Sequence, residues 1–257
     1  MTNYEGFKPI FERIVKEGGL ESYIANRVSG RKEYPSLENR FGSEVPAQIL
    51  WEFAESYPEI YETARKMLIN LEADSERAQD GEYGWGLSYL LAGHDADSKK
   101  IALDLLLTKG RPVLPEPYFA EETEMGLLCL VNNYNSIEFP EEKIEQAVRL
   151  FSWYIENPSE SFIAISQHAA RALLIVDYGE GIKMLPKAMD NQVDHRHFTL
   201  AWYLVQEKDP VILARDLFKN LNAQYLNYFV DALRFSSANF QDEKSEAFKK
   251  EIERLRK

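Results

Sequence analysis

The sequence predicts an all-α protein built as an αα-superhelix, a right-handed solenoid of stacked antiparallel helix pairs. Apolar residues recur at helical spacing along most of the 257 residues. No stretch alternates apolar and polar residues as a half-buried strand would. One pattern of apolar residues returns at intervals of about thirty residues between 162 and 236. Because a single helix pair cannot bury its apolar face alone, we expect such units to stack on their neighbours.

The repeated pattern defines three helices, expected at 162–176, 193–206 and 223–236, whose equivalent positions are 29 and 31 residues apart. We expect the residues at these positions to face the core, with Trp202 buried among them. They are Ala169, Ala172, Leu173 and Val176 in the first helix, Phe198, Ala201, Trp202 and Val205 in the second, and Phe229, Ala232, Leu233 and Ser236 in the third.

Helical spacing and end signals predict the remaining elements. A first helix that carries Phe7, Ile10 and Ile14 ends at Gly18. Asp209 and Pro210 form a helix cap followed by a first-turn proline. Further helices are expected at 20–28, 45–57, 58–71, 83–92, 98–108, 118–132, 141–156 and 242–256, with a loop at 29–42, a polar connection at 73–82 and an extended connector around Pro112, Pro115 and Pro117.

These elements predict one elongated domain over 1–257. Within it, 1–44 is a less regular helical segment, 140–237 holds the clearest repeats and 241–257 is a C-terminal capping helix. Residues 167–190 resemble a HEAT-like, armadillo-type repeat: an alanine-rich helix, an acidic residue, a turn and a second helix with spaced apolar residues. The matching residues are Ala169, Ala172, Leu173, Asp177, Ile182, Leu185 and Ala188. The resemblance implies an interaction surface on the second helices and no particular activity.

Composition limits the class of partner. The net charge is −12 and the pI is near 5.0, which disfavours nonspecific binding to nucleic acid or to an anionic membrane. The single cysteine, Cys129, cannot form an intrachain disulfide, which favours a reducing compartment. The first ten residues mix charged and apolar side chains, unlike a signal peptide. We therefore expect a cytoplasmic protein.

Glutamates are concentrated between residues 116 and 145, where Lys143 is the single basic residue. Such a run is either a solvated face or an acidic surface that steers a basic partner. The sequence leaves both interpretations open. The glutamates are Glu116, Glu121, Glu122, Glu124, Glu138, Glu141, Glu142 and Glu145.

Polar, aromatic and arginine residues flank the apolar stripes of the repeats. They predict a partner-binding surface, since tyrosine, tryptophan and arginine anchor interfaces. Four of them, His168, Arg171, His197 and Tyr228, are expected on one concave strip. The complete set is Gln167, His168, Arg171, Asp194, His197, Asn227, Tyr228, Asp231 and Arg234.

Chemical motifs are weak in this chain. Asp194 with His197, or His197 with His168, supplies only two metal ligands, so we expect no metal and no cofactor. His94-Asp95 lacks the upstream histidine that an HD-type metal site needs. Gly84-Trp85-Gly86 does not follow a strand, as a phosphate loop would.

The sequence thus favours a module that binds a protein partner, for which a basic partner and an inhibitor or immunity-type role fit the charge. Two enzymatic alternatives stay open. A DNA glycosylase of HEAT-like build would need a basic groove. A carbohydrate-active helical toroid would need two carboxylates that face each other across a cleft.

Overall fold

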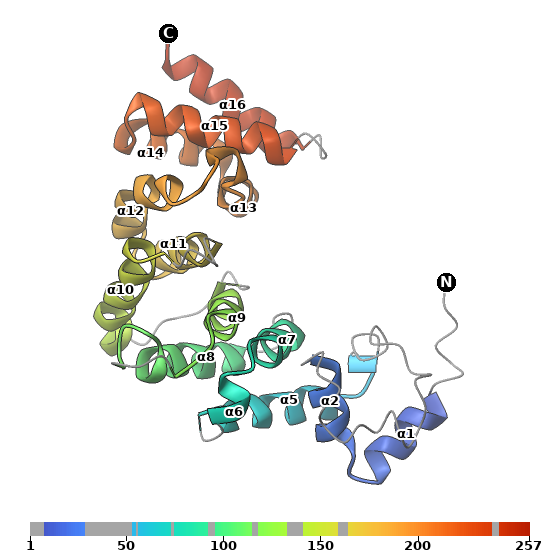
Figure 1. Cartoon of the computed structure of the whole chain (residues 1–257). Coiled ribbons are helices and arrows are strands. Elements are labelled where there is room, and N and C mark those ends of the chain that lie inside the picture. The colour runs from blue at the N-terminus through green and yellow to red at the C-terminus, as the bar shows by residue number, and fades with distance from the viewer. Residues whose placement is uncertain are drawn as a thin grey trace. The chain divides into compact units, whose positions relative to one another are not determined.

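The computed structural model describes residues 8–28, 53–54, 56–72, 75–91, 96–114, 118–132, 141–158, 164–237 and 242–257. These residues form fourteen α-helices and one short 3-10 helix, and no strand occurs among them (Figure 1). The all-α prediction is confirmed over this part of the chain. None of the helices described here combines the length and apolarity needed to cross a lipid bilayer.

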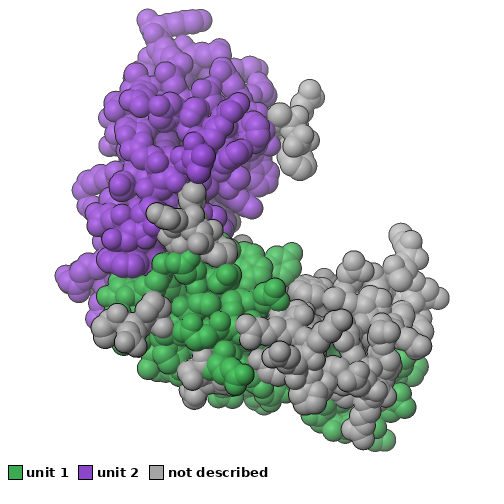
Figure 2. Space-filling view, in the orientation of Figure 1, with its two compact units in different colours: residues 1–133 green, residues 134–257 purple. Residues whose placement is uncertain are grey.

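The chain divides into two compact units, residues 1–133 and residues 134–257 (Figure 2). The first contains α1 (Lys8–Lys16), α2 (Leu20–Val28), α5 (Glu59–Asn70), α6 (Ser75–Ala78), α7 (Gly81–Leu91), α8 (Ala96–Lys109) and α9 (Glu121–Asn132). The second contains α10 (Glu141–Glu156), α11 (Ala164–Val176), α12 (Tyr178–Asp190), the 3-10 helix η2 (His195–His197), α13 (Leu200–Glu207), α14 (Pro210–Asn220), α15 (Ala223–Ser237) and α16 (Glu243–Leu255).

Glycines bring the helices of the first unit close together. Helix α7 packs against α9 and α2. A Cβ atom on Gly84 would lie 2.3 Å from Oγ1 of Thr123 in α9, and one on Gly86 would lie 2.5 Å from the carbonyl oxygen of Val28. The Gly84-Trp85-Gly86 triplet is therefore a close-packing surface in the middle of a helix.

The turn that follows α8 is held by a buried carboxylate. Glu124 of α9 is fully buried, and its Oε1 atom accepts a hydrogen bond of 2.7 Å from the backbone N–H of Arg111. The Arg111 side chain donates to the other oxygen, Oε2, at 2.5 Å. The prediction of an extended connector is wrong for residues 111–114, which form a turn closed by the Val113 N–H and the Gly110 carbonyl. Residues 115–117 lie outside the described part.

The apolar stripes of the second unit are largely as predicted. The buried positions are Ala169, Ala172 and Leu173 in α11, Phe198, Ala201 and Val205 around α13, and Phe229, Ala232 and Leu233 in α15. Val176, Ser236 and Trp202 are partly exposed. The prediction that Trp202 is buried is therefore wrong, since its ring reaches the surface beside a cavity.

Local end signals placed several helices correctly. Helices α2 and α10 have the predicted bounds. Asp209 caps α14 by accepting hydrogen bonds of 2.9 Å from the N–H groups of Val211 and Ile212. The connection predicted at 73–82 instead holds α6 and the start of α7. Most of the helix predicted at 45–57, and the His94-Asp95 pair, fall outside the described residues.

The helix predicted at 193–206 is wrong, because the chain breaks there into η2 and α13. Asp194 caps η2 by accepting a hydrogen bond of 2.9 Å from the Arg196 N–H. Two backbone groups at the break, the His197 carbonyl and the Leu200 N–H, bond to the Gln167 side chain of α11. These bonds replace the ones that a continuous helix would make.

Candidate functional site

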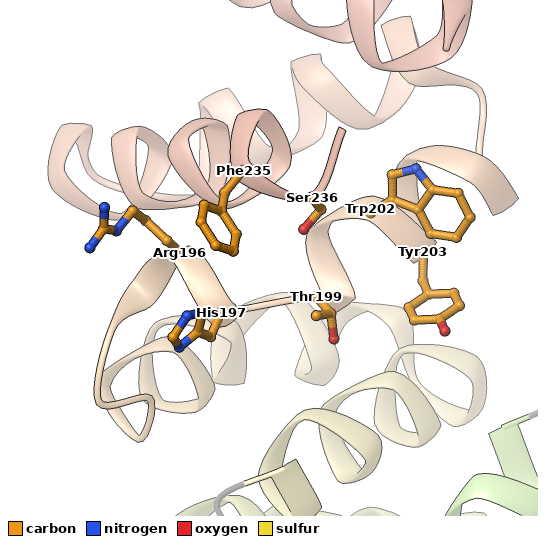
Figure 3. Close-up of a pocket in the computed structure, with 7 residues that line it drawn as sticks. All are labelled: Arg196, His197, Thr199, Trp202, Tyr203, Phe235 and Ser236. Carbon is orange, nitrogen blue, oxygen red and sulfur yellow. The ribbon is translucent and has the colours of Figure 1, made fainter. Parts of the chain in front are cut away.

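An open pocket of about 620 Å³ lies in the second unit, between the η2–α13 segment and the C-terminal end of α15. In Figure 3, Arg196 and His197 lie at its left, Trp202 and Tyr203 at its right, and Thr199 and Ser236 between them. Phe235 points downward beside Arg196 and His197. The described lining residues are Arg196, His197, Thr199, Trp202, Tyr203, Phe235 and Ser236.

Gln167 holds the backbone that carries this lining. Its Nε2 atom donates to the His197 carbonyl at 3.1 Å. Its Oε1 atom accepts from the Leu200 N–H and from the Thr199 hydroxyl, both at 3.2 Å. Gln167 is only 8% exposed. Its predicted place on the partner-binding surface is therefore wrong, and its bonds support that surface from within.

The right-hand end of the pocket is aromatic. Tyr203 is 41% exposed and Phe235, toward the other end, is 51% exposed. The guanidinium carbon of Arg171 lies 4.7 Å from the centre of the Tyr203 ring, and the same arginine forms an ion pair with Glu207. Arg171 thus fixes Tyr203 from α11. The predicted role of Arg171 at the surface becomes an indirect one, because its side chain is only 13% exposed.

The left-hand end of the pocket is basic. The Nε atom of Arg196 donates to Oδ2 of Asp194 at 2.8 Å. Hydrogen bonds from the Arg196 side chain, and then from its backbone N–H, hold the pKa of Asp194 well below its usual range. The Arg196 guanidinium lies 6.0 Å from the Phe235 ring centre, and the His197 ring meets Phe235 edge to face at 5.5 Å. None of the described residues that line the pocket is acidic.

A second aromatic contact lies next to the basic end. The His195 ring stacks on Tyr228 with centres 4.2 Å apart and planes at 17°. Its Nε2 atom is 3.8 Å from Asp231 and its Nδ1 atom is 3.9 Å from Asp194. His195 thereby joins three of the predicted site residues, Asp194, Tyr228 and Asp231, although it was not among them.

The other predicted site residues lie in separate surroundings. His168 is largely buried on α11, and burial, followed by the charge of Arg171, lowers its pKa to about 4. Asn227 accepts a hydrogen bond from Arg256 and borders a different pocket, at the ends of α14, α15 and α16. Arg234 pairs with Asp231 at 3.4 Å. The placement of His168, Arg171, His197 and Tyr228 on one concave strip stays a prediction.

The predicted set omitted most of the pocket lining. Tyr203 and Phe235 were missed because both lie outside the predicted apolar stripes. Tyr203 directly follows Trp202, and Phe235 lies two residues after Leu233. The signal that could have found them is their size, because large aromatic residues outside an apolar stripe are candidates for contact surfaces.

The predicted acidic surface divides in the structure. Glu141, Glu142 and Glu145 are exposed, and Glu145 pairs with Arg149. Glu121 and Glu122 are partly buried. Glu124 is wrong as a surface residue, because it is the fully buried partner of Arg111. Glu116 and Glu138 lie outside the described residues.

The described residues contain no group of three or more histidine, cysteine, aspartate or glutamate side chains that could hold a metal ion. Comparison of the chain with models of protein families, with curated proteins and with solved structures finds no match. The function is therefore inferred from the geometry of the site.

Proposed function

We propose that this protein binds a partner protein and that the pocket between η2–α13 and α15 receives side chains of that partner. The observation that carries the proposal is the exposure of Tyr203 and Phe235, 41% and 51%, around a concave surface that also contains Arg196. Tyrosine, tryptophan and arginine supply most of the binding energy at protein interfaces. The pocket's volume of about 620 Å³ is in the range of known ligand sites.

We further propose that the second unit is a HEAT-like stack, as the sequence resemblance implies. Helix-to-neighbour packing supports this, since α10 contacts α11 and α12, α11 contacts α13, and α12 contacts α14 and α15. In such a stack, adjacent helices present equivalent positions along one surface. The partner would then extend beyond the pocket along that surface.

A basic partner, which the sequence favours, would need an acidic surface away from the pocket. Residues 1–133 contain 23 acidic and 14 basic residues, whereas residues 134–257 contain 19 and 16. A basic protein would be steered either by the larger acidic excess of the first unit or by the exposed Glu141, Glu142 and Glu145 on α10 of the second unit. The pocket, whose charged lining residue is an arginine, calls for a different chemistry.

The test is capture of partners from a lysate of the native cells by the tagged full chain and by two variants. Tyr203→Ala combined with Phe235→Ala removes both exposed rings. Ile212→Ala is the control, since Ile212 is 59% exposed on α14 and does not line the pocket. Quantitative mass spectrometry compares the captured proteins, and a captured candidate is then titrated against all three chains.

We expect the wild type and the Ile212→Ala chain to capture the same partner. The double variant should bind it at least about tenfold more weakly, as loss of interface aromatics does. Its melting temperature should remain close to that of the wild type, because exposed substitutions change stability little. Equal binding by all three chains would show that the pocket is not the binding site.

A further inference from the structure

We infer that the partner segment that enters this pocket is acidic and apolar. Its carboxylate would lie at the Arg196–His197 end, and a neighbouring aromatic or large aliphatic side chain would lie at the Trp202–Tyr203 end. This inference rests on the proposed function and specifies the chemistry of the partner.

The basic end offers hydrogen-bond donors. Arg196 uses Nε and Nη2 on Asp194, and in the described part of the chain its Nη1 atom has no acceptor. Its side chain is 57% exposed. The His197 ring is exposed, meets Phe235 edge to face and interacts electrostatically with Asp194. An arginine with a free nitrogen beside an imidazole suits a carboxylate, which accepts charge-assisted hydrogen bonds.

Acidic groups near the pocket are already engaged. Asp194 is bonded to Arg196, and Glu207 is paired with Arg171. Asp231 is paired with Arg234, and Asp242 accepts a hydrogen bond from Trp202. A lysine or arginine of a partner would therefore lose hydration without gaining an uncommitted carboxylate. Arg196 is the charged residue among the described lining residues, and the net charge of −12 of the chain gives no indication of it.

The apolar end suits a ring or a branched side chain. The Trp202 and Tyr203 rings meet edge to face with centres 5.3 Å apart. Figure 3 shows them at the end of the pocket opposite to Arg196 and His197. Burying an aromatic or large aliphatic side chain there removes apolar surface from water on both partners. A carboxylate and an apolar side chain close together in one segment would match both ends.

The experiment selects ligands from a phage-displayed library of random linear peptides on the immobilised full chain. We expect the enriched peptides to carry aspartate or glutamate next to an aromatic or large aliphatic residue. A synthetic representative is then titrated by fluorescence anisotropy. Replacing its acidic residue by the neutral amide, or its apolar residue by alanine, should weaken binding about tenfold. These peptide changes leave the fold of the protein untouched.

Protein variants locate the binding. Phe235→Ala and Arg196→Gln should each weaken binding of the representative peptide about tenfold. Arg149→Gln should leave it unchanged, since Arg149 is an exposed arginine paired with a glutamate on α10, away from the lining. Circular dichroism melting curves confirm that each variant is folded.

Each outcome decides between the two proposals. If the enriched peptides were basic and bound the Phe235→Ala variant more weakly than the wild type, the proposal of an acidic ligand would be overturned. The proposal that the pocket binds a partner protein would still stand. Peptides that bind Phe235→Ala and Arg196→Gln as well as the wild type would overturn both. A library that yields no enriched sequence would overturn the acidic and apolar ligand, while the capture experiment would still decide the proposed function.

Discussion

Gln167 shows how a single buried amide positions a binding surface. Its side chain bonds to Gln192, to the His197 carbonyl, to the Thr199 hydroxyl and to the Leu200 N–H. The segment that carries Arg196 and His197 is thereby attached to α11. A buried amide in this role cannot be replaced by an apolar residue without leaving backbone groups unbonded.

We predict that Gln167→Leu lowers the free energy of unfolding by about 1–3 kcal/mol, because the Leu200 N–H and the His197 carbonyl lose their partner in a buried place. Urea titration of the full chain measures the change. Gln224→Leu is the control, since Gln224 is exposed and its side chain donates an exposed hydrogen bond to the Tyr228 hydroxyl. Equal losses for both variants would contradict the role assigned to Gln167.

His168 predicts a dependence of stability on pH. Its pKa in the folded protein is about 4, against an ordinary value of 6.5. Below pH 6.5 the unfolded chain therefore binds a proton that the folded chain does not. The stabilisation is fully present above pH 6.5 and is lost progressively as the pH falls toward 4. At 1.36 kcal/mol per pKa unit, the loss reaches about 3 kcal/mol.

The measurement compares urea titrations of the wild type and His168→Gln between neutral pH and pH 4.5. We expect the difference in unfolding free energy between the two chains to shrink with falling pH, because the variant lacks the titrating group. Gln224→Leu, which alters an exposed residue without a titrating group, should keep the wild-type profile. Parallel profiles for wild type and His168→Gln would contradict this prediction.

Sequence reasoning worked for residues whose environment follows from periodicity. Ala169, Phe198 and Phe229 recur at equivalent positions, and all three are buried. It failed for Gln167 and Glu124, because both are polar residues whose burial depends on a partner elsewhere in the chain. The partners of Gln167 lie about thirty residues further on, and no local pattern identifies them.

At the scale of elements, helix ends that depend on neighbouring residues were predicted correctly, whereas a helix break that depends on a distant residue was missed. The start of α14 was predictable because Asp209 and Pro210 are adjacent and act on the next turn. The break between η2 and α13 was not predictable, because the Gln167 side chain of another helix satisfies the backbone there. The sequence between 193 and 206 has helical periodicity, and tertiary hydrogen bonds override it.

The approach of α7 to α9 depends on glycine. We predict that Gly84→Ala destabilises the chain by about 3 kcal/mol, because the new methyl group would overlap Thr123 in a packed interface. The control is Gly179→Ala in α12, where the nearest atom to an added Cβ is the Asp177 carboxylate at 3.4 Å. There the better helix propensity of alanine should leave stability unchanged or raised by up to about 1 kcal/mol.

Thermal and urea unfolding of the two glycine variants measure the contrast. If Gly84→Ala proved as stable as Gly179→Ala, the two helices would have to be further apart than the structure places them. The Gly84-Trp85-Gly86 triplet would then need another explanation.

At the scale of the whole molecule, the charge is unevenly distributed. Residues 1–133 carry an excess of nine acidic side chains and residues 134–257 an excess of three. The all-α class of the described residues was predictable from composition and periodicity, which are properties of the whole chain. The division into two compact units was not, because it depends on which helices pack together across long stretches of sequence. Likewise, the net charge of the chain does not reveal that the pocket contains an arginine, Arg196.

The charge of the whole molecule leads to the last prediction, which concerns nucleic acid. A protein that binds duplex DNA must place lysine or arginine side chains on the phosphates. When these side chains neutralise the phosphates, counterions leave the DNA, and this release supplies almost all of the affinity for nonspecific DNA. Acidic residues outnumber basic ones in both units. Several arginines are already paired with carboxylates, among them Arg111, Arg171 and Arg254. We therefore expect no retarded band in a gel-shift experiment with duplex DNA at about 50 mM salt, where such binding is strongest.

A basic DNA-binding protein in a parallel lane verifies the conditions of this experiment. A retarded band that disappears as the salt is raised would require a basic surface on this chain, and it would favour the DNA glycosylase alternative over the binding of a protein partner.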